Sequence, residues 1–313
     1  RIKGDKADGQ EVSCLFFVMR INMERVRIAD QIVELEVSDQ DFFKKRLQEY
    51  AIVDTNQKSD MNLTTCILEE IPAPEGTVIK KVRDAEVLCL QDGTFCRVLY
   101  DQERSRILHA IYFDKQYTSV RAEIRRDRKM EELQATDFEY IFSGSAFSDR
   151  LAVLGDAVLH GSAIAFQGQG VIFSAISGVG KSTHTGLWKE RFKEKVEIVN
   201  DDKPAIRFRD EVPWIYGTPW SGKTDLNRNI SVPLAAVVFL KRDIKNWIEP
   251  MNISERMYNI TNQLMVPFYD EEVGRKLAAF AARLAQSVPM YYLHCNISQE
   301  AVEIVRKEIF CDN

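Results

Sequence analysis

Apolar and polar positions follow different patterns in the two halves of the chain. Up to residue 125, short apolar-rich runs are separated by polar turns, a pattern typical of strands. The predicted strands cover residues 12–19, 32–37, 86–90, 95–100, 107–113 and 117–124. Asp92-Gly93 between two of these runs predicts a hairpin, because both residues accept the positive φ of a tight turn. The short spacing leaves little room for crossover helices, so the pattern predicts an antiparallel meander.

From Asp137 onward, helical and strand patterns alternate along the chain. Apolar residues at helical spacing predict helices from residue 137 to a stop at Gly155, and over 182–193, 272–286 and 301–309. Apolar runs predict strands at residues 160–166, 171–174, 196–199, 237–240 and 290–294. We therefore expect an α/β (α+β) protein. It has a β-rich domain over residues 1–135, of unknown role, and a mixed-sheet domain over residues 136–313, with the charged stretch Arg125–Glu132 near the boundary.

A phosphate-binding loop is predicted where the sequence reads VIFSAISGVGKST, at residues 171–183. The turn from Ser177 to Gly180 can direct backbone N–H groups at phosphate oxygens, since glycine tolerates positive φ. Lys181 supplies a charge to the β and γ oxygens, and the Ser182 hydroxyl can ligate Mg²⁺. The predicted nucleotide-binding residues are Ser177, Gly178, Val179, Gly180, Lys181, Ser182 and Thr183. The expected ligands are ATP and Mg²⁺.

Two features complicate this assignment. The motif G-x-x-x-x-G-K-[ST] has glycine at its first position, where this chain has Ala175, which costs little if its φ is negative. A second segment, residues 217–224, matches the motif without a mismatch. Pro219 has no N–H to donate there, Trp220 is bulky, and no helical pattern follows. We therefore place the nucleotide on the first segment and expect the second to be a mobile or substrate-facing loop.

An acidic pair follows the predicted strand at 196–199. Asp201 and Asp202 precede Pro204, which removes a ladder donor and allows both carboxylates to turn toward the phosphates. One can hold Mg²⁺ and the other can accept a proton from an attacking hydroxyl. Further candidates for contacts with phosphate or substrate are the basic residues Lys223, Arg228 and Arg242.

Composition narrows the classes of partner. The 313 residues carry a net charge of −5, and a pI of about 5.6 argues against nucleic-acid binding. The six cysteines are scattered without metal-ligand spacing, which indicates reduced thiols. No apolar run approaches the length of a membrane span, and no signal peptide is visible. We therefore expect a cytoplasmic protein with no membrane partner.

The motifs together resemble the catalytic domain of HPr kinase/phosphorylase, whose fold is related to phosphoenolpyruvate carboxykinase. The resemblance rests on His160-Gly-Ser, Ser-Gly-Val-Gly-Lys-Ser and Asn-Asp-Asp, and covers roughly residues 136–313. It implies that His160 is an active-site histidine, Lys181 the phosphate lysine and Ser182 a magnesium ligand. It further implies that Asp202 accepts the proton, that Asp201 lies near the metal, and that a homo-oligomer is plausible.

Two departures leave the phosphoryl acceptor open. The family has a glutamate metal ligand in the stretch corresponding to Trp214–Gly217, where this chain has no acid, and the front half differs from the family's N-terminal domain. We therefore expect a Mg·ATP-dependent serine-type kinase acting on a hydroxyl of a small protein, peptide or free amino acid. The alternative is a nucleotide-sensing or peptide-binding adaptor without catalysis. A carboxykinase is disfavoured, because no arginine-rich oxaloacetate site is visible.

Overall fold

The chain folds around two β-sheets with one long helix between them. A computed structural model describes residues 24–53, 57–82, 84–176, 178–266 and 270–310, so the predicted strand at 12–19 lies outside the described residues. The first sheet has the strand order β1-β2-β3-β8-β7-β6-β5-β4. Its strands are β1 (Glu24–Ile28), β2 (Gln31–Glu36), β3 (Met61–Leu68), β4 (Gly76–Val82), β5 (Ala85–Leu90), β6 (Phe95–Tyr100), β7 (Ile107–Phe113) and β8 (Ser119–Arg125).

The predicted meander is confirmed from β5 to β8, where each strand pairs antiparallel with the next, and β4, which the pattern did not predict, pairs antiparallel with β5. The hairpin at Asp92-Gly93 is also present, with Gly93 at φ +81°. The antiparallel expectation is wrong at β3, which pairs in parallel with both β2 and β8, and the expectation of no crossover helix is wrong between β2 and β3. Strands β2 and β3 pair in parallel, and α1 (Gln40–Leu47) with the 3₁₀ turn η1 (Gln48–Tyr50) forms their connection. The Asp39 side chain caps α1 by accepting from the Phe42 N–H, so a short helix forms where the apolar pattern is too brief to predict one.

The second sheet is mixed, as predicted. Its strand order is β12-β10-β11-β15-β14-β13-β9, with β17 beside β15 and β16 beside β17. Strand β15 pairs in parallel with β11 and β17, and the other pairs in this sheet are antiparallel. The strands are β9 (Ala157–Val158), β10 (Ser162–Phe166), β11 (Gln169–Ser174), β12 (Val196–Asn200), β13 (Ala205–Arg209), β14 (Val212–Tyr216), β15 (Ser231–Arg242), β16 (Trp247–Pro250) and β17 (Met290–Cys295).

The four predicted helices are present, together with one that the pattern did not predict. They are α2 (Ala135–Leu154), α3 (Lys181–Phe192), α4 (Ile253–Gln263), α5 (Glu271–Ser287) and α6 (Gln299–Ile309). Helix α2 ends at Gly155, which takes the left-handed conformation at φ +84°. The unpredicted helix is α4, which begins with a capping box between Asn252 and Glu255.

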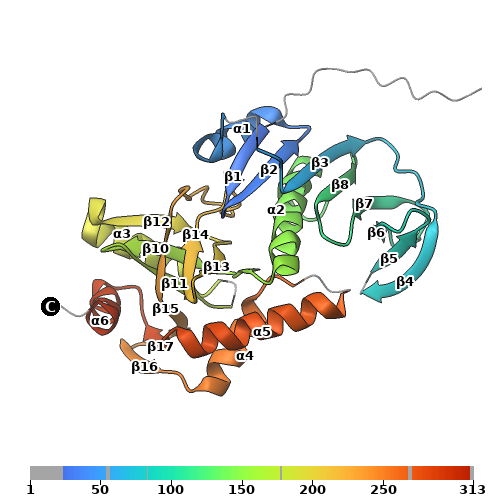
Figure 1. The fold of residues 1–313 in the computed structure, drawn as a ribbon. Coiled ribbons are helices and arrows are strands. Elements are labelled where there is room, and N and C mark those ends of the chain that lie inside the picture. The colour runs from blue at the N-terminus through green and yellow to red at the C-terminus, as the bar shows by residue number, and fades with distance from the viewer. Residues whose placement is uncertain (1–23, 54–56, 83, 177, 267–269, 311–313) are drawn as a thin grey trace, which may run out of the picture.

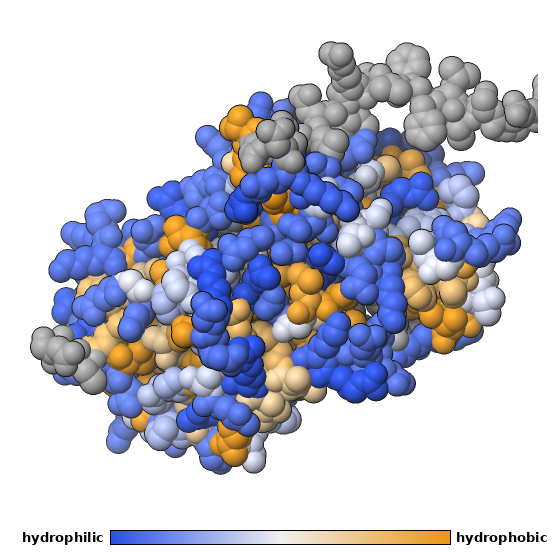
Figure 2. All heavy atoms as spheres, viewed as in Figure 1, coloured by the Kyte–Doolittle hydropathy of each residue, from blue (hydrophilic) through white to orange (hydrophobic). Residues whose placement is uncertain are grey.

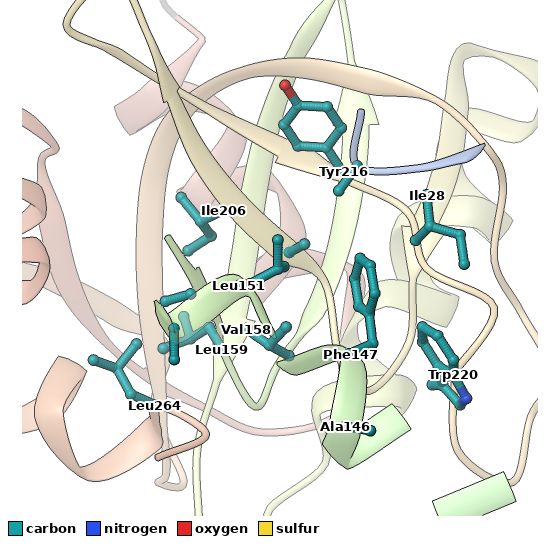
Figure 3. Close-up of a cluster of buried hydrophobic side chains, with 14 of the residues drawn as sticks. Ile28, Ala146, Phe147, Leu151, Val158, Leu159, Ile206, Tyr216, Trp220 and Leu264 are labelled. Carbon is teal, nitrogen blue, oxygen red and sulfur yellow. The ribbon is translucent and has the colours of Figure 1, made fainter. Parts of the chain in front are cut away.

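Helix α2 joins the two sheets through a common core. It contacts β3 and β8 of the first sheet and β9 of the second, and it lies between the two sheets in Figure 1. One hydrophobic cluster runs from Ile28 in β1 through Phe147 and Leu151 of α2 to the second sheet and α5. Figure 3 shows Ile28 on the same side of this cluster as Phe147 and Trp220. The predicted domain boundary at residues 135/136 coincides with the start of α2, and independent folding of the two parts stays a prediction.

Most of the surface in view is polar. Figure 2 shows a face on which hydrophilic residues predominate and hydrophobic ones form small separate patches. Among the described residues, no helix combines the length and apolar character that a membrane crossing requires.

Candidate functional site

The predicted phosphate-binding loop connects a buried strand to a helix. Strand β11 ends at Ser174 and α3 begins at Lys181. Gly178 and Gly180 take left-handed conformations, at φ +82° and +118°, which direct the backbone around the loop as only glycine does readily. Ala175 is not among the residues at positive φ, so alanine is tolerated at the position where the motif has glycine. Ser177 lies outside the described residues.

Lys181 points inward, toward His160. The residue is only 9% exposed. Its Nζ donates to His160 Nε2 at 3.0 Å and to the Ala175 carbonyl at 3.3 Å. Burial lowers the pKa of Lys181, although the nearby carboxylates of Asp202 and Asp201 oppose the shift. The ammonium group therefore lies at the base of the loop in a poorly hydrated position, where an anionic ligand would stabilise its charge.

His160 links this lysine to Asp202. An ammonium group can only donate, so His160 Nε2 accepts and the ring proton lies on Nδ1. Nδ1 is 3.2 Å from Asp202 Oδ1, and Lys203 Nζ is 3.4 Å from Asp202 Oδ2. Burial by itself would raise the pKa of Asp202, but the hydrogen bond from His160 and the charge of Lys203 outweigh it, and the net shift is downward. Asp202 is thus a carboxylate held in its charged form at the end of a Lys–His–Asp chain.

Asp201 faces a shell of hydroxyl groups instead. It is 5% exposed, and its Oδ1 accepts from Ser162 at 2.5 Å and from Thr185 at 3.5 Å. Its Oδ2 accepts from Thr224 at 2.7 Å. The Thr185 hydroxyl also reaches the Ser182 carbonyl, at 3.1 Å, so Asp201 and the first turn of α3 share a neighbour.

The two acids diverge because Asn200 turns the chain. Its side-chain Oδ1 accepts from the N–H groups of Asp202 and Lys203, at 2.8 and 2.5 Å, in the manner of an Asx turn. The sequence suggested that Pro204 would allow this turn, whereas the hydrogen bonds that form it come from Asn200. The two carboxylates consequently have separate partners rather than a common orientation.

Ser182 and Asp201 are the metal ligands predicted from the sequence. Among the described residues there is no group of three or more His, Cys, Asp or Glu side chains that could hold a metal ion. Mg²⁺ commonly takes one or two protein oxygens and completes its shell with phosphate and water. Ser182 is exposed, and the Thr185 hydroxyl lies 3.1 Å from the Ser182 carbonyl oxygen and 3.5 Å from Asp201 Oδ1, so both predicted ligands neighbour Thr185.

The second glycine-rich segment does not form a phosphate-binding loop. No helix follows residues 217–224, and Trp220 is buried with its ring stacked on Phe147 at 5.1 Å. Hydrogen bonds hold the segment against α2, such as that from the Ser221 N–H to the Tyr140 hydroxyl at 2.8 Å, and the expectation of a mobile or substrate-facing loop stays a prediction. It lies over the acids, because a Cβ added at Gly222 would be 3.1 Å from Asp202 Cβ.

The three candidate basic residues lie in different places. Arg242, at the end of β15, donates to the carbonyls of Gly178 and Val179 and so supports the phosphate-binding loop from outside. Lys223 is exposed and follows Gly222. The third, Arg228, pairs with acids on the opposite side of the segment, at 2.5 Å from Glu49 and 3.9 Å from Glu197. Among the described residues, the hydrogen bonds from these three candidates to the loop come from Arg242.

A pocket of about 530 Å³ opens beside the loop. Its apolar wall includes Val179, Leu187, Leu240 and Ile297, and Arg242 lies at its edge. The pocket borders Gly178 and Gly180, so a ligand with phosphates on the loop could place an apolar ring there.

Several site residues were not singled out from the sequence. Ser162, Thr185 and Thr224 surround Asp201 but come from β10, α3 and the 217–224 segment. No spacing rule connects them, since a strand, a helix and a loop that are apart in the sequence supply them. The sequence signal that could have indicated Thr224 is its place in the second motif match.

Comparison with known proteins places most of this site in one family. A family model described as SynChlorMet cassette protein ScmC matches residues 145–310. The chain belongs to the ScmC family. The ScmC match includes His160, Lys181, both acids and the 217–224 segment, and it excludes the first sheet and α1.

Other comparisons add little to the ScmC assignment. No curated protein matches the chain in sequence. A solved structure of the Hpr(Ser) kinase/phosphatase from Coxiella burnetii aligns with 10% identity, covering 48% of this chain and 95% of that chain, with a TM-score of 0.30. A TM-score this low supports no argument about function.

Proposed function

We propose that this protein is a Mg·ATP-dependent kinase that transfers the γ-phosphoryl group to a hydroxyl acceptor. The observation that carries the proposal is the chain of contacts from Lys181 through His160 to Asp202. These contacts put the Lys181 ammonium group and the Asp202 carboxylate on either side of a single imidazole ring. Phosphoryl transfer needs both groups, one for the phosphate charge and one for the acceptor proton.

The nucleotide would lie across the loop at residues 178–183. Its phosphates would accept from the backbone N–H groups at the start of α3, where the helix dipole favours negative charge. Lys181 would exchange its bond to His160 for one to a phosphate oxygen, which is favourable because the lysine charge is poorly hydrated. The base would occupy the pocket lined by Leu187, Leu240 and Ile297.

Ser182 and Asp201 would hold the magnesium ion. When bound, Mg²⁺ neutralises charge on the phosphate oxygens. The Ser162 and Thr224 hydroxyls donate to the Asp201 carboxylate and would hold it in place as a metal ligand.

Asp202 would accept the proton of the acceptor hydroxyl. The acceptor oxygen forms a bond to the γ-phosphorus, the bond from that phosphorus to the bridging oxygen of ADP breaks, and the proton passes to the Asp202 carboxylate. His160 orients this carboxylate through its Nδ1 proton. The resemblance to HPr kinase/phosphorylase supports the same roles for these residues and favours serine, in a small protein, a peptide or the free amino acid, as the acceptor.

Label transfer from γ-labelled ATP tests the proposal. The acceptors would be free serine, serine-containing peptides and small carrier proteins, and the enzymes would be the wild type, Lys181→Ala and Asp202→Asn. Asp210→Asn, an exposed acid in the turn between β13 and β14, is a control for the charge change. We expect transfer by the wild type and the control, and a loss of about 10²–10⁴ for Asp202→Asn. Equal transfer by all four proteins would refute the assigned roles, and ATP binding without transfer to any acceptor would favour the adaptor.

A further inference from the structure

The segment at residues 217–229 is held on one side by α2. The Tyr140 hydroxyl accepts from the Ser221 N–H at 2.8 Å and lies 3.1 Å from the Pro219 carbonyl, to which it donates. Trp220 Nε1 donates to Ser143 Oγ at 2.9 Å. These contacts fix the first half of the segment to the helix between the two sheets.

The same segment contacts the acids of the candidate site. Thr224 donates to Asp201 Oδ2 at 2.7 Å, and the Asp201 N–H donates to the Leu226 carbonyl at 3.1 Å. Two residues further along the segment, the Arg228 N–H donates to the carbonyl of Val199, which precedes Asn200. The position of Asp201 thus depends on where residues 224–228 lie.

Residues 225–229 are in turn held by α1 and η1, which belong to the first half of the chain. Arg46 pairs with Asp225 at 2.8 Å, with side chains that are only 15% and 27% exposed. The fully buried Tyr50 donates to Asn227 Oδ1 at 2.8 Å. Asn227 in turn binds the first half of the segment, because its Nδ2 donates to Ser221 Oγ at 2.9 Å.

Glu49 adds contacts at the end of the segment. Its carboxylate pairs with Arg228 at 2.5 Å, and its backbone carbonyl accepts from Asn229 Nδ2 at 3.0 Å. Three neighbouring residues, Arg46, Glu49 and Tyr50, therefore hold four of the five residues from 225 to 229.

We propose that α1–η1 forms part of the catalytic site by positioning Asp201, with Arg46 and Tyr50 as the positioning residues. The proposal rests on the proposed kinase function. Neither side chain touches a reacting group; both act through residues 224–228, which place the Thr224 hydroxyl and the Leu226 carbonyl against Asp201. The first half of the chain, outside the ScmC match, would then be required for a competent metal-binding acid.

The expected effects separate positioning from folding. Tyr50→Phe keeps the buried ring and removes one hydrogen bond, so we expect kcat to fall about fivefold. Arg46→Met removes the ion pair with Asp225, and we expect kcat to fall about tenfold. The KM for ATP should stay within about twofold, because among the described residues neither side chain is hydrogen-bonded or ion-paired to the phosphate-binding loop. Thr224→Val should lower kcat at least as far as Arg46→Met, and Thr224→Ser should restore it because the hydroxyl is kept. Tyr100→Phe, on β6 of the first sheet, is the matched control for the loss of a tyrosine hydroxyl.

Amide hydrogen exchange gives a readout that does not depend on kinase activity. The amides of Asp201 and Arg228 should exchange about tenfold faster in Arg46→Met and severalfold faster in Tyr50→Phe, while those of β11 and α3 remain unchanged. If the wild type transfers no phosphoryl group, the kinase proposal fails. The exchange data still decide whether α1–η1 holds Asp201 in position. Unchanged exchange at both amides, or a uniform increase over the whole chain, would overturn the positioning role. A fall in kcat that Thr224→Ser does not restore would overturn it as well.

Discussion

Replacing Lys181 with methionine should lower nucleotide affinity without lowering the stability of the fold. Methionine has a similar length and no charge, so the variant removes the ammonium group with little change in packing. The lysine is 9% exposed, and burial lowers its pKa. A lysine whose folded pKa lies below the unfolded value destabilises the fold wherever it is protonated, which includes pH 7. The free energy of unfolding without nucleotide should therefore stay the same or rise in Lys181→Met.

The affinity for Mg·ATP should fall in the same variant. A hydrogen bond to a charged group contributes about 1.5–3 kcal/mol, which corresponds to an increase in Kd of about 10- to 150-fold. Isothermal titration calorimetry with Mg·ATP, beside urea unfolding, measures both quantities. Lys80→Met on the exposed strand β4 is the control for the loss of a lysine, and its Kd should stay within about twofold. An unchanged Kd in Lys181→Met, or a larger loss in Lys223→Met, would refute the placement of the phosphates.

Three further predictions follow from single sites. A Cβ at Gly217 would lie 1.8 Å from the Arg228 carbonyl oxygen, which is a backbone atom. Gly217→Ala should therefore lower the free energy of unfolding, measured in urea, by at least about 1–3 kcal/mol. A change below about 0.5 kcal/mol would contradict the close approach. Burial raises the pKa of Asp149 to about 6, so its ionisation costs stability as pH rises from about 4 to 6. Asp149→Asn should therefore stabilise the protein by up to about 3 kcal/mol at pH 7 and hardly at pH 4, whereas an equal gain at both would be inconsistent with that pKa. Ser182→Ala should raise the Mg²⁺ concentration that gives half-maximal ADP formation about tenfold, while the affinity for metal-free ATP stays the same. An unchanged Mg²⁺ requirement would refute the role of Ser182 as a metal ligand.

The parts of the site that could be predicted from the sequence are those formed by neighbouring residues. The strand, turn and helix at residues 171–183 carry their own apolar pattern and glycines, so the strand–turn–helix and its positive-φ glycines follow from local chemistry. The second motif match shows the limit of a pattern alone. Residues 217–224 satisfy it, yet Trp220 is buried there and no helix follows, so the context decided the assignment.

The parts that could not be predicted depend on contacts between distant segments. The hydroxyl shell of Asp201 brings together Ser162, Thr185 and Thr224, up to 39 positions away in sequence. The pairing of Tyr50 with Asn227 spans 177 positions and depends on a short crossover helix whose apolar pattern is too brief to recognise. Arg228 was expected near the phosphates because it is basic and close in sequence, whereas a partner from the other half of the chain binds it.

A crystal structure with Mg²⁺ and a non-hydrolysable ATP analogue would test the central claim most directly. We expect the phosphates on the N–H groups of residues 178–183, with Lys181 Nζ moved from His160 Nε2, now 3.0 Å away, to a phosphate oxygen. The metal should lie between Ser182 and Asp201. Phosphates bound at residues 217–224, or a lysine still on His160 beside a nucleotide bound elsewhere, would contradict the account.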